Sequence, residues 1–109
     1  MASKFIAEVV GTFFFLGVII VSVAGKSLSH YEKADAWIHI GLALAISILF
    51  MGKISGGHFN PAVSFMFFLN KDIGTEQLAI YIIAQIIGAA LAFGAYQLLY
   101  VGAGNKNNS

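Results

Sequence analysis

The sequence predicts an all-α membrane protein with three transmembrane helices and one shorter, re-entrant half-helix. Hydrophobic residues make up 59% of the 109 residues, charged residues make up 10%, and the mean hydropathy is +0.85. An average soluble domain is about 45 to 50% apolar and about 25% charged. The apolar residues fall into three long stretches, and a fourth stretch is too short to cross a bilayer.

The three long stretches cover residues 5–24, 36–53 and 76–101, and a polar tail follows at 102–109. Each is close to the length of about 20 residues that a helix needs to span about 30 Å of hydrocarbon. The first stretch exceeds the apolar region of a secretory signal, which is about 7 to 15 residues long, and it contains Glu8. We therefore expect three retained spanning helices.

Residues 54–69 join a glycine-rich turn to a short apolar piece. Asn60 before Pro61 favours a helix start, because proline lacks the N–H that would be unpaired there and asparagine can cap the next ones. The eight residues that follow, 62–69, rise about 12 Å as a helix, less than half of the hydrocarbon thickness. The turn exposes carbonyl groups, which the membrane interior tolerates only beside protein or water. We therefore expect the chain to enter as extended backbone and return as a half-helix.

The expected half-helix points the positive end of its dipole at the membrane midplane. The Asn60 side chain can add an NH₂ donor at this point. Four backbone carbonyls can form a row of acceptors on the approach, those of Gly56, Gly57, His58 and Phe59. Central donors and a row of acceptors suit a single file of water.

Three motifs carry a family resemblance. Residues 7–12 read Ala-Glu-Val-Val-Gly-Thr, residues 55–62 read Ser-Gly-Gly-His-Phe-Asn-Pro-Ala, and residues 84–89 read Ala-Gln-Ile-Ile-Gly-Ala. In order and spacing they resemble the N-terminal half of the aquaporin and glycerol-facilitator family, over nearly the whole chain. The resemblance implies a channel whose pore motif is Asn60-Pro61-Ala62, with Glu8 and Gln85 supporting the loop backbone. It also implies close helix packing at three small residues, Gly41, Gly88 and Ala92.

The family resemblance also implies a partner. Family members resemble two inverted copies of this unit, with two half-helices that meet at the midplane, whereas this sequence carries one such loop. The lysines favour neither orientation, because we expect Lys4, Lys53 and Lys71 on one side and Lys26, Lys33 and Lys106 on the other. The prediction is a dual-topology homodimer, one aquaporin-fold repeat completed by an inverted second copy, with four dimers in the full assembly. A separate second-half polypeptide is the competing partner.

The constriction of the expected pore is apolar. In the family's second loop an arginine usually follows Asn-Pro-Ala, but here Val63 stands at that place and the chain contains no arginine. The family's offsets from Asn60 place Ile40 and Ile48 at the constriction. A homodimer would combine Ile40 of one chain with Ile48, Gly57 and Val63 of the other. We expect it to pass water and small neutral solutes such as glycerol or ammonia, and to exclude ions.

Two other functions compete with the channel. Small multidrug exporters are of similar length and resemble this chain at residues 7–12, where Glu8 would be the proton and drug site. A purely structural protein would have its pore shut by Phe59 or Ile40. An enzyme is not expected, because no set of nucleophile, base and orienting group is present.

Cofactors, metals and nucleic acid are not expected as ligands of this protein. The chain has no cysteine and its three histidines are scattered, so no metal-ligand spacing occurs. No basic run suggests nucleic acid. The expected partners are the lipid bilayer, an inverted copy of the chain and the permeating solute. The expected location is an integral, multi-pass position in a membrane that the sequence does not specify.

Overall fold

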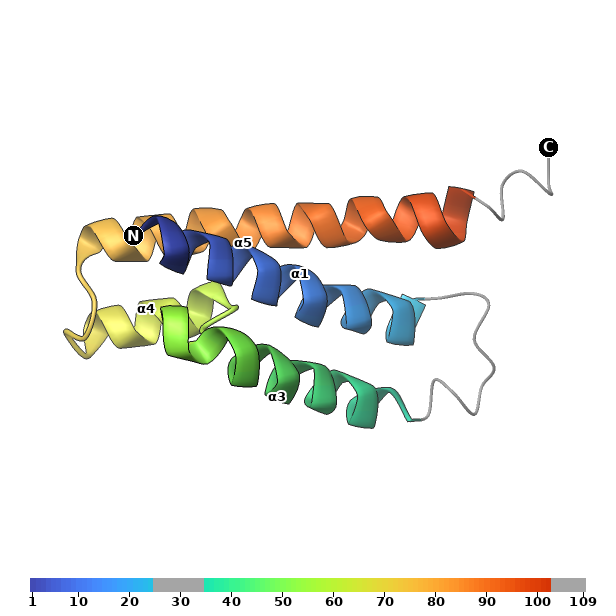
Figure 1. Cartoon of the computed structure of the whole chain (residues 1–109), viewed down its shortest axis with the longest axis horizontal. Coiled ribbons are helices and arrows are strands. Elements are labelled where there is room, and N and C mark those ends of the chain that lie inside the picture. Colours follow the sequence, from blue (N-terminus) through green and yellow to red (C-terminus); the bar gives the residue numbers. More distant parts are fainter. Residues whose placement is uncertain (25–34, 103–109) are drawn as a thin grey trace.

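The computed structural model describes residues 1–24 and 35–102, and these residues form helices joined by short loops (Figure 1). The three long helices have the length and hydropathy of membrane spans, which confirms the all-α, multi-pass prediction. The helices are α1 (Ala2–Ala24), α3 (Ala36–Ser55), α4 (Pro61–Leu69) and α5 (Thr75–Tyr96), and α5 continues as the π-helix η1 (Gln97–Val101).

Helix α1 lies between α3 and α5 and packs against both (Figure 1). The contact with α5 depends on Gly88, because a Cβ there would lie 2.8 Å from both the Thr12 Cβ and the Val9 carbonyl oxygen. Ala92 is buried along the same helix. Gly41 has no neighbour within 4 Å of where its Cβ would be, so the close packing expected at this glycine does not occur within one copy.

The chain reverses direction between α3 and α4. Gly56 ends α3 in the left-handed conformation, with φ of 91°, and its N–H donates to the Gly52 carbonyl. The following loop turns back toward the middle of the molecule, and α4 runs from there to the end at which α3 stopped (Figure 1). With 9 residues, α4 rises only about 14 Å and packs against α5. The N-terminal end of α4 therefore lies partway along the length of the bundle, away from both of its ends (Figure 1).

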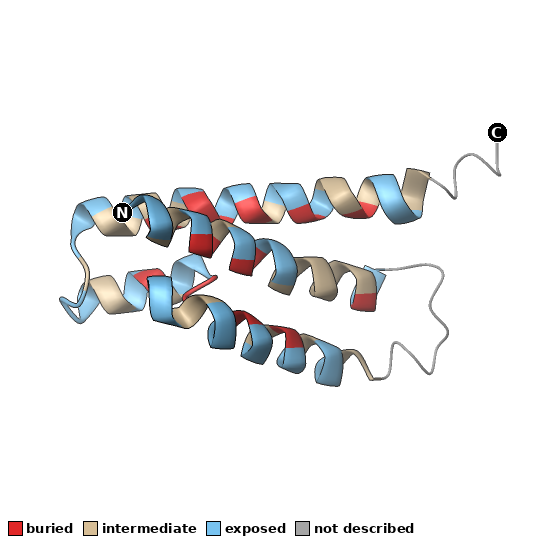
Figure 2. Ribbon diagram, viewed as in Figure 1, coloured by how far each residue is buried: buried red, intermediate tan, exposed pale blue. Residues whose placement is uncertain are grey.

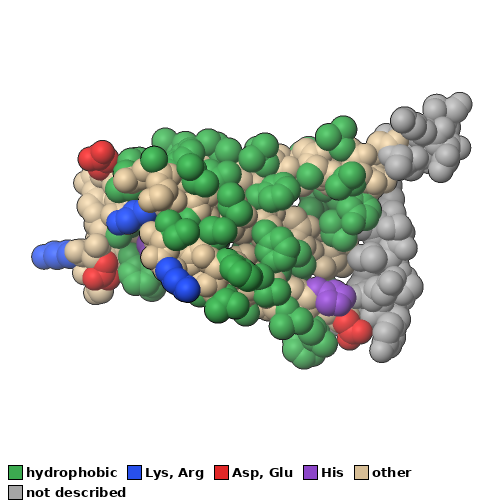
Figure 3. All heavy atoms as spheres, viewed as in Figure 1, with side chains coloured by type: hydrophobic (Ala, Val, Ile, Leu, Met, Phe, Trp, Pro, Cys, Tyr) green, Lys and Arg blue, Asp and Glu red, His purple; other side chains and the backbone are tan. Residues whose placement is uncertain are grey.

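Buried residues gather on the facing sides of α1, α3 and α5 and in the loop before α4 (Figure 2). The outward surfaces are apolar, and side chains such as Trp37 and Leu98 are 72% and 79% exposed. Figure 3 shows hydrophobic side chains covering one face between two ends that carry the charged groups. A surface of this kind is suited to lipid or to other apolar helices.

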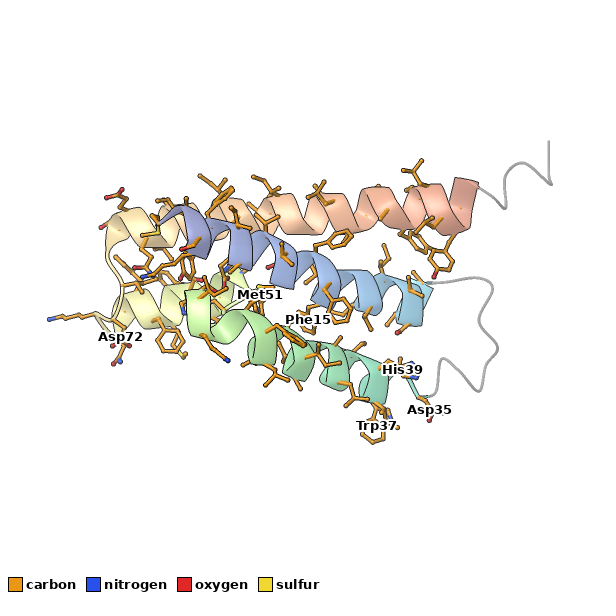
Figure 4. All side chains as sticks on the ribbon, in the orientation of Figure 1. Phe15, Asp35, Trp37, His39, Met51 and Asp72 are labelled. Carbon is orange, nitrogen blue, oxygen red and sulfur yellow. The ribbon has the colours of Figure 1, made fainter. Side chains whose placement is uncertain are left out.

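The described residues place three lysines at one end of the bundle. Lys4 in α1, Lys53 at the end of α3 and Lys71 after α4 share one end, by the course of their helices (Figure 1). Asp35 and Trp37 lie at the opposite end, far from Asp72 (Figure 4). Lys26, Lys33 and Lys106 lie outside the described residues, so the predicted balance of lysines stays a prediction.

Candidate functional site

The site is built around Glu8, which lies within α1 and is completely buried. Its Oε2 accepts hydrogen bonds from Ser55 Oγ at 2.6 Å and His58 N at 3.1 Å. Its Oε1 accepts hydrogen bonds from Phe59 N at 2.8 Å and Gln85 Nε2 at 2.9 Å. A carboxylate offers about four lone-pair positions, so these four donors use its whole acceptor capacity. One side chain thereby joins α1 to α3, α5 and the loop.

The backbone N–H groups of the loop are all directed into the protein. Gly56 N donates to Gly52, Gly57 N donates to Ser55 Oγ, and the next two N–H groups donate to Glu8. The carbonyl oxygens behave differently, because within the described part of the chain no hydrogen bond reaches those of residues 56–59. The N–H groups of the loop are therefore paired, whereas its carbonyls have no hydrogen-bond partner among the described residues.

Phe59 fixes the loop to α1 through its side chain. Its φ of 53° lies in the left-handed region, which is unfavourable for a bulky residue and needs support from its surroundings. The ring is 2% exposed and occupies the space beside Gly11, where a Cβ would lie 2.1 Å from the Phe59 Cε1 atom. The phenyl ring is therefore packed against α1 in the single chain, and the alternative of a pore shut by Phe59 or Ile40 stays a prediction.

The Asn60-Pro61-Ala62 segment stays open at the start of α4. Asn60 has extended backbone, and its Oδ1 accepts a hydrogen bond from Ala62 N at 2.8 Å. All three residues are exposed in the single chain. Because Oδ1 is engaged, the amide is oriented, and its Nδ2 has no hydrogen-bond partner among the described residues. The N-terminus of α4 thus presents a side-chain donor together with the positive end of its dipole.

A second group of polar side chains supports the loop from the α4 and α5 side. Gln85 Nε2 also donates to Ser64 Oγ at 2.9 Å, and Ser64 Oγ lies 2.8 Å from His58 Nδ1. The His58 ring stacks on Phe67 with a centroid distance of 4.7 Å and meets Tyr81 edge-on at 4.9 Å. These contacts hold the imidazole between α4 and α5.

Sequence reasoning did not identify three members of this cluster: Ser55, Ser64 and Tyr81. The Tyr81 hydroxyl donates to the Ser55 carbonyl at the end of α3. A signal existed for Ser64, which is the one polar residue in the α4 sequence PAVSFMFFL. A lone polar residue in a short apolar helix needs a partner, and it could have been paired with Gln85 on that ground.

The four residues expected at the constriction are not all together in one copy. Ile48 lies beside Gly57, where a Cβ would be 3.3 Å from the Ile48 Cγ1 atom, and Val63 is half-buried in the first turn of α4. Ile40 lies eight residues before Ile48 on α3, about 12 Å away along the helix and toward its other end. One copy therefore groups Ile48 with Gly57 and leaves Ile40 apart.

No group of three or more His, Cys, Asp or Glu side chains that could hold a metal ion occurs in the described residues. The polar side chains of the site instead form hydrogen bonds with one another and with the loop backbone.

Comparison with known proteins gives a consistent result. A family model described as Major intrinsic protein matches residues 1–109. Among curated proteins, the chain is 43% identical to a glycerol uptake facilitator protein-like protein of Lactiplantibacillus plantarum, over 84% of this chain and 41% of that protein. It is 37% identical to nodulin-26 of Glycine max, over 91% of this chain and 37% of the relative. It is 38% identical to aquaporin PIP1-5 of Zea mays, over 95% of this chain and 39% of the relative. The chain thus spans about two fifths of the length of these relatives.

Proposed function

The chain belongs to the major intrinsic protein family, and we propose that it forms a passive membrane channel for water and small neutral solutes, with the pore between two antiparallel copies. The observation that carries this proposal is the division of the loop backbone. Its N–H groups at residues 56–59 are paired inside the protein, and no hydrogen bond from the described residues reaches its carbonyls. Unpaired carbonyls are too costly in hydrocarbon, so a membrane location requires protein or water beside them, and a water-filled path would provide it.

The same loop explains how ions and protons would be disfavoured. The N-terminal end of α4 carries the positive end of a helix dipole, equivalent to about half an elementary charge. This end repels cations, while the exposed Asn60 amide offers a donor to neutral solutes. The open carbonyls of residues 56–59 offer acceptors along the approach, in the role predicted for them. Water can therefore exchange its hydrogen bonds step by step, which a desolvated ion cannot.

An inverted second copy would complete the pore. The exposed Asn60-Pro61-Ala62 end of α4 needs a neighbour, and a two-fold axis in the membrane plane would bring the same end of another copy against it. Ile40 of one copy would then join Ile48, Gly57 and Val63 of the other at each mouth, which accounts for its separation within one chain. Glu8 and Gln85 would support each loop. Four such dimers form the proposed assembly, and a separate second-half polypeptide is the alternative partner.

Permeability tests both the channel and the role of Asn60. Liposomes that contain the purified chain should shrink or swell faster than empty liposomes in stopped-flow light scattering. Asn60→Ala removes the donor, and its water permeability should fall about two- to tenfold, because a net hydrogen bond contributes about 0.5 to 1.5 kcal/mol.

The matched control for this experiment is Asn70→Ala, at the other end of α4, where the amide donates to Asp72 at 2.8 Å on the exposed side. Its permeability should equal that of the unmodified chain. If the purified chain conducts no faster than empty liposomes, the homomeric channel is excluded. If it conducts alone, a separate second-half partner is unnecessary.

Topology provides an independent test, because the chain has no cysteine of its own. A single Thr75→Cys variant places a thiol at the exposed start of α5 without changing the charge of either end. In intact membranes a membrane-impermeant maleimide should label about half of the molecules, as balanced lysines predict. Permeabilised membranes, as the control, should be labelled completely. Complete or absent labelling in intact membranes would contradict the dual-topology dimer.

A further inference from the structure

The hydrogen bonds of the Ser64 hydroxyl determine which ring nitrogen of His58 carries a hydrogen. Gln85 Nε2 donates both of its protons, one to Glu8 Oε1 at 2.9 Å and one to Ser64 Oγ at 2.9 Å. The opposite orientation of this amide would place its carbonyl oxygen against the Glu8 carboxylate. Ser64 is therefore an acceptor toward Gln85, and its own single proton remains to be placed.

The remaining partner of Ser64 is His58. Ser64 is fully buried, and among the described residues its Oγ has no hydrogen-bond partner other than Gln85 Nε2 and His58 Nδ1, the latter at 2.8 Å. If Nδ1 carried the ring proton, the Ser64 hydroxyl proton would be buried without an acceptor, which is unfavourable. The hydroxyl therefore donates to Nδ1. A neutral imidazole then carries its hydrogen on Nε2.

The Nε2 atom lies on the accessible side of the ring. It has no hydrogen-bond partner among the described residues, and it is not one of the enclosed unpartnered side-chain atoms there, which are Thr12 Oγ1 and Gln85 Oε1. It lies beside Gly56, where a Cβ would be 3.5 Å from Nε2. Gly56 is exposed and begins the row of open carbonyls. An N–H on Nε2 would therefore stand beside the Gly56 backbone.

We propose that Ser64 is a positioning residue that holds His58 in the neutral Nε2–H form, and that this N–H binds the oxygen of a passing water or small alcohol. The binding step rests on the proposed channel function, whereas the tautomer does not. A hydroxyl group at this point could accept from Nε2–H. The His58 side chain would then bind a solute before the solute reaches Asn60.

The tautomer is directly measurable by ¹⁵N NMR of the two ring nitrogens in protein reconstituted into lipid. In the unmodified chain we expect a protonated Nε2 and an unprotonated Nδ1 at His58. Ser64→Ala removes the hydroxyl donor, so both tautomers should become populated. Ser64→Thr keeps a hydroxyl and should restore the Nε2–H form. His39, which is exposed on α3, should show the same spectrum in every variant.

The outcome for the unmodified chain does not depend on whether a variant folds. A protonated Nδ1 in that chain, or an unchanged tautomer in a folded Ser64→Ala protein, would overturn the role of Ser64. Magnetisation transfer from water to Nε2–H tests the binding step, and its absence would overturn that step. His58 can be in the Nε2–H form in a chain that conducts no water, which would contradict only the channel. The chain can also conduct water with His58 in the Nδ1–H form, which would contradict only the role of Ser64.

Discussion

Replacing Glu8 with alanine is expected to lower the free energy of unfolding by about 2 to 6 kcal/mol. The variant leaves the N–H groups of His58 and Phe59 without their acceptor, and each unsatisfied buried donor costs about 1 to 3 kcal/mol. Ser55 and Gln85 lose a partner as well. Denaturant titration in mixed micelles measures the stability. Hydrogen exchange at the amides of residues 58 and 59 should accelerate more than exchange in α5.

Glu8→Gln is the more selective variant of the same position. The Ser55 hydroxyl can reverse and accept from the new NH₂ group, which leaves the His58 N–H as the one backbone group without an acceptor. The expected loss is therefore smaller, about 1 to 3 kcal/mol. Glu76→Gln, at the exposed start of α5, is the control, and it should cost less than about 1 kcal/mol, the value of a charge near a helix terminus.

The glutamine variant also separates the channel from a proton-coupled exporter. An exporter would need the Glu8 proton and would lose transport with its fold intact. In the structure the carboxylate is enclosed and holds four donors, which leaves no position for a cationic drug. A stable Glu8→Gln protein with unchanged exchange at residues 58 and 59 would contradict the support that we assign to Glu8.

The second large effect is expected at Gly11. In Gly11→Ala the new methyl group would lie 2.1 Å from the Phe59 ring, so the ring must leave its place beside α1. Overpacking of this kind costs about 1 to 3 kcal/mol. The loop depends on the same ring, so the water permeability of reconstituted protein should fall together with stability.

Gly17→Ala on the same helix is the matched control, because apart from the helix's own nearby backbone no described atom lies within 4 Å of its Cβ position. Alanine is the better helix former by up to about 1 kcal/mol, so this variant should be neutral or slightly stabilising. Equal stability of the two variants would show that Phe59 does not need the space beside Gly11. Thermal unfolding of both proteins in the same detergent makes this comparison.

The sequence predicted those features of the fold that depend on a single continuous segment of the chain. Apolar length alone indicates the spanning helices, and the Asn60-Pro61 pair contains the local chemistry of a helix start, which the structure places at the beginning of α4. Reasoning of this kind predicted the class of fold, because hydropathy depends on composition within a window. It also singled out Glu8 as an acid that needs an explanation inside an apolar helix.

The contacts of the candidate site could not be predicted in this way, because they depend on which side chains the fold brings together. Ser55 and Ser64 are ordinary residues in sequence, and their importance comes from Glu8, Gln85 and His58, which the fold brings to them. The left-handed conformation of Phe59 could not be anticipated, because it is unfavourable locally and is held by contacts from α1. Gly41 illustrates the converse, since the glycine in its helix did not reveal that no neighbour approaches it within one copy.

The open carbonyls of the loop also bear on how the protein can vary. These acceptors are backbone atoms, so no side-chain replacement removes them. The conformation of the loop depends on Glu8, which lies 47 to 51 positions before the residues that it binds. Genetic change at the loop surface should therefore be tolerated better than change on the buried face of α1. A mutational scan should therefore find sensitive positions on the buried face of α1, far in sequence from the loop that this helix holds in place.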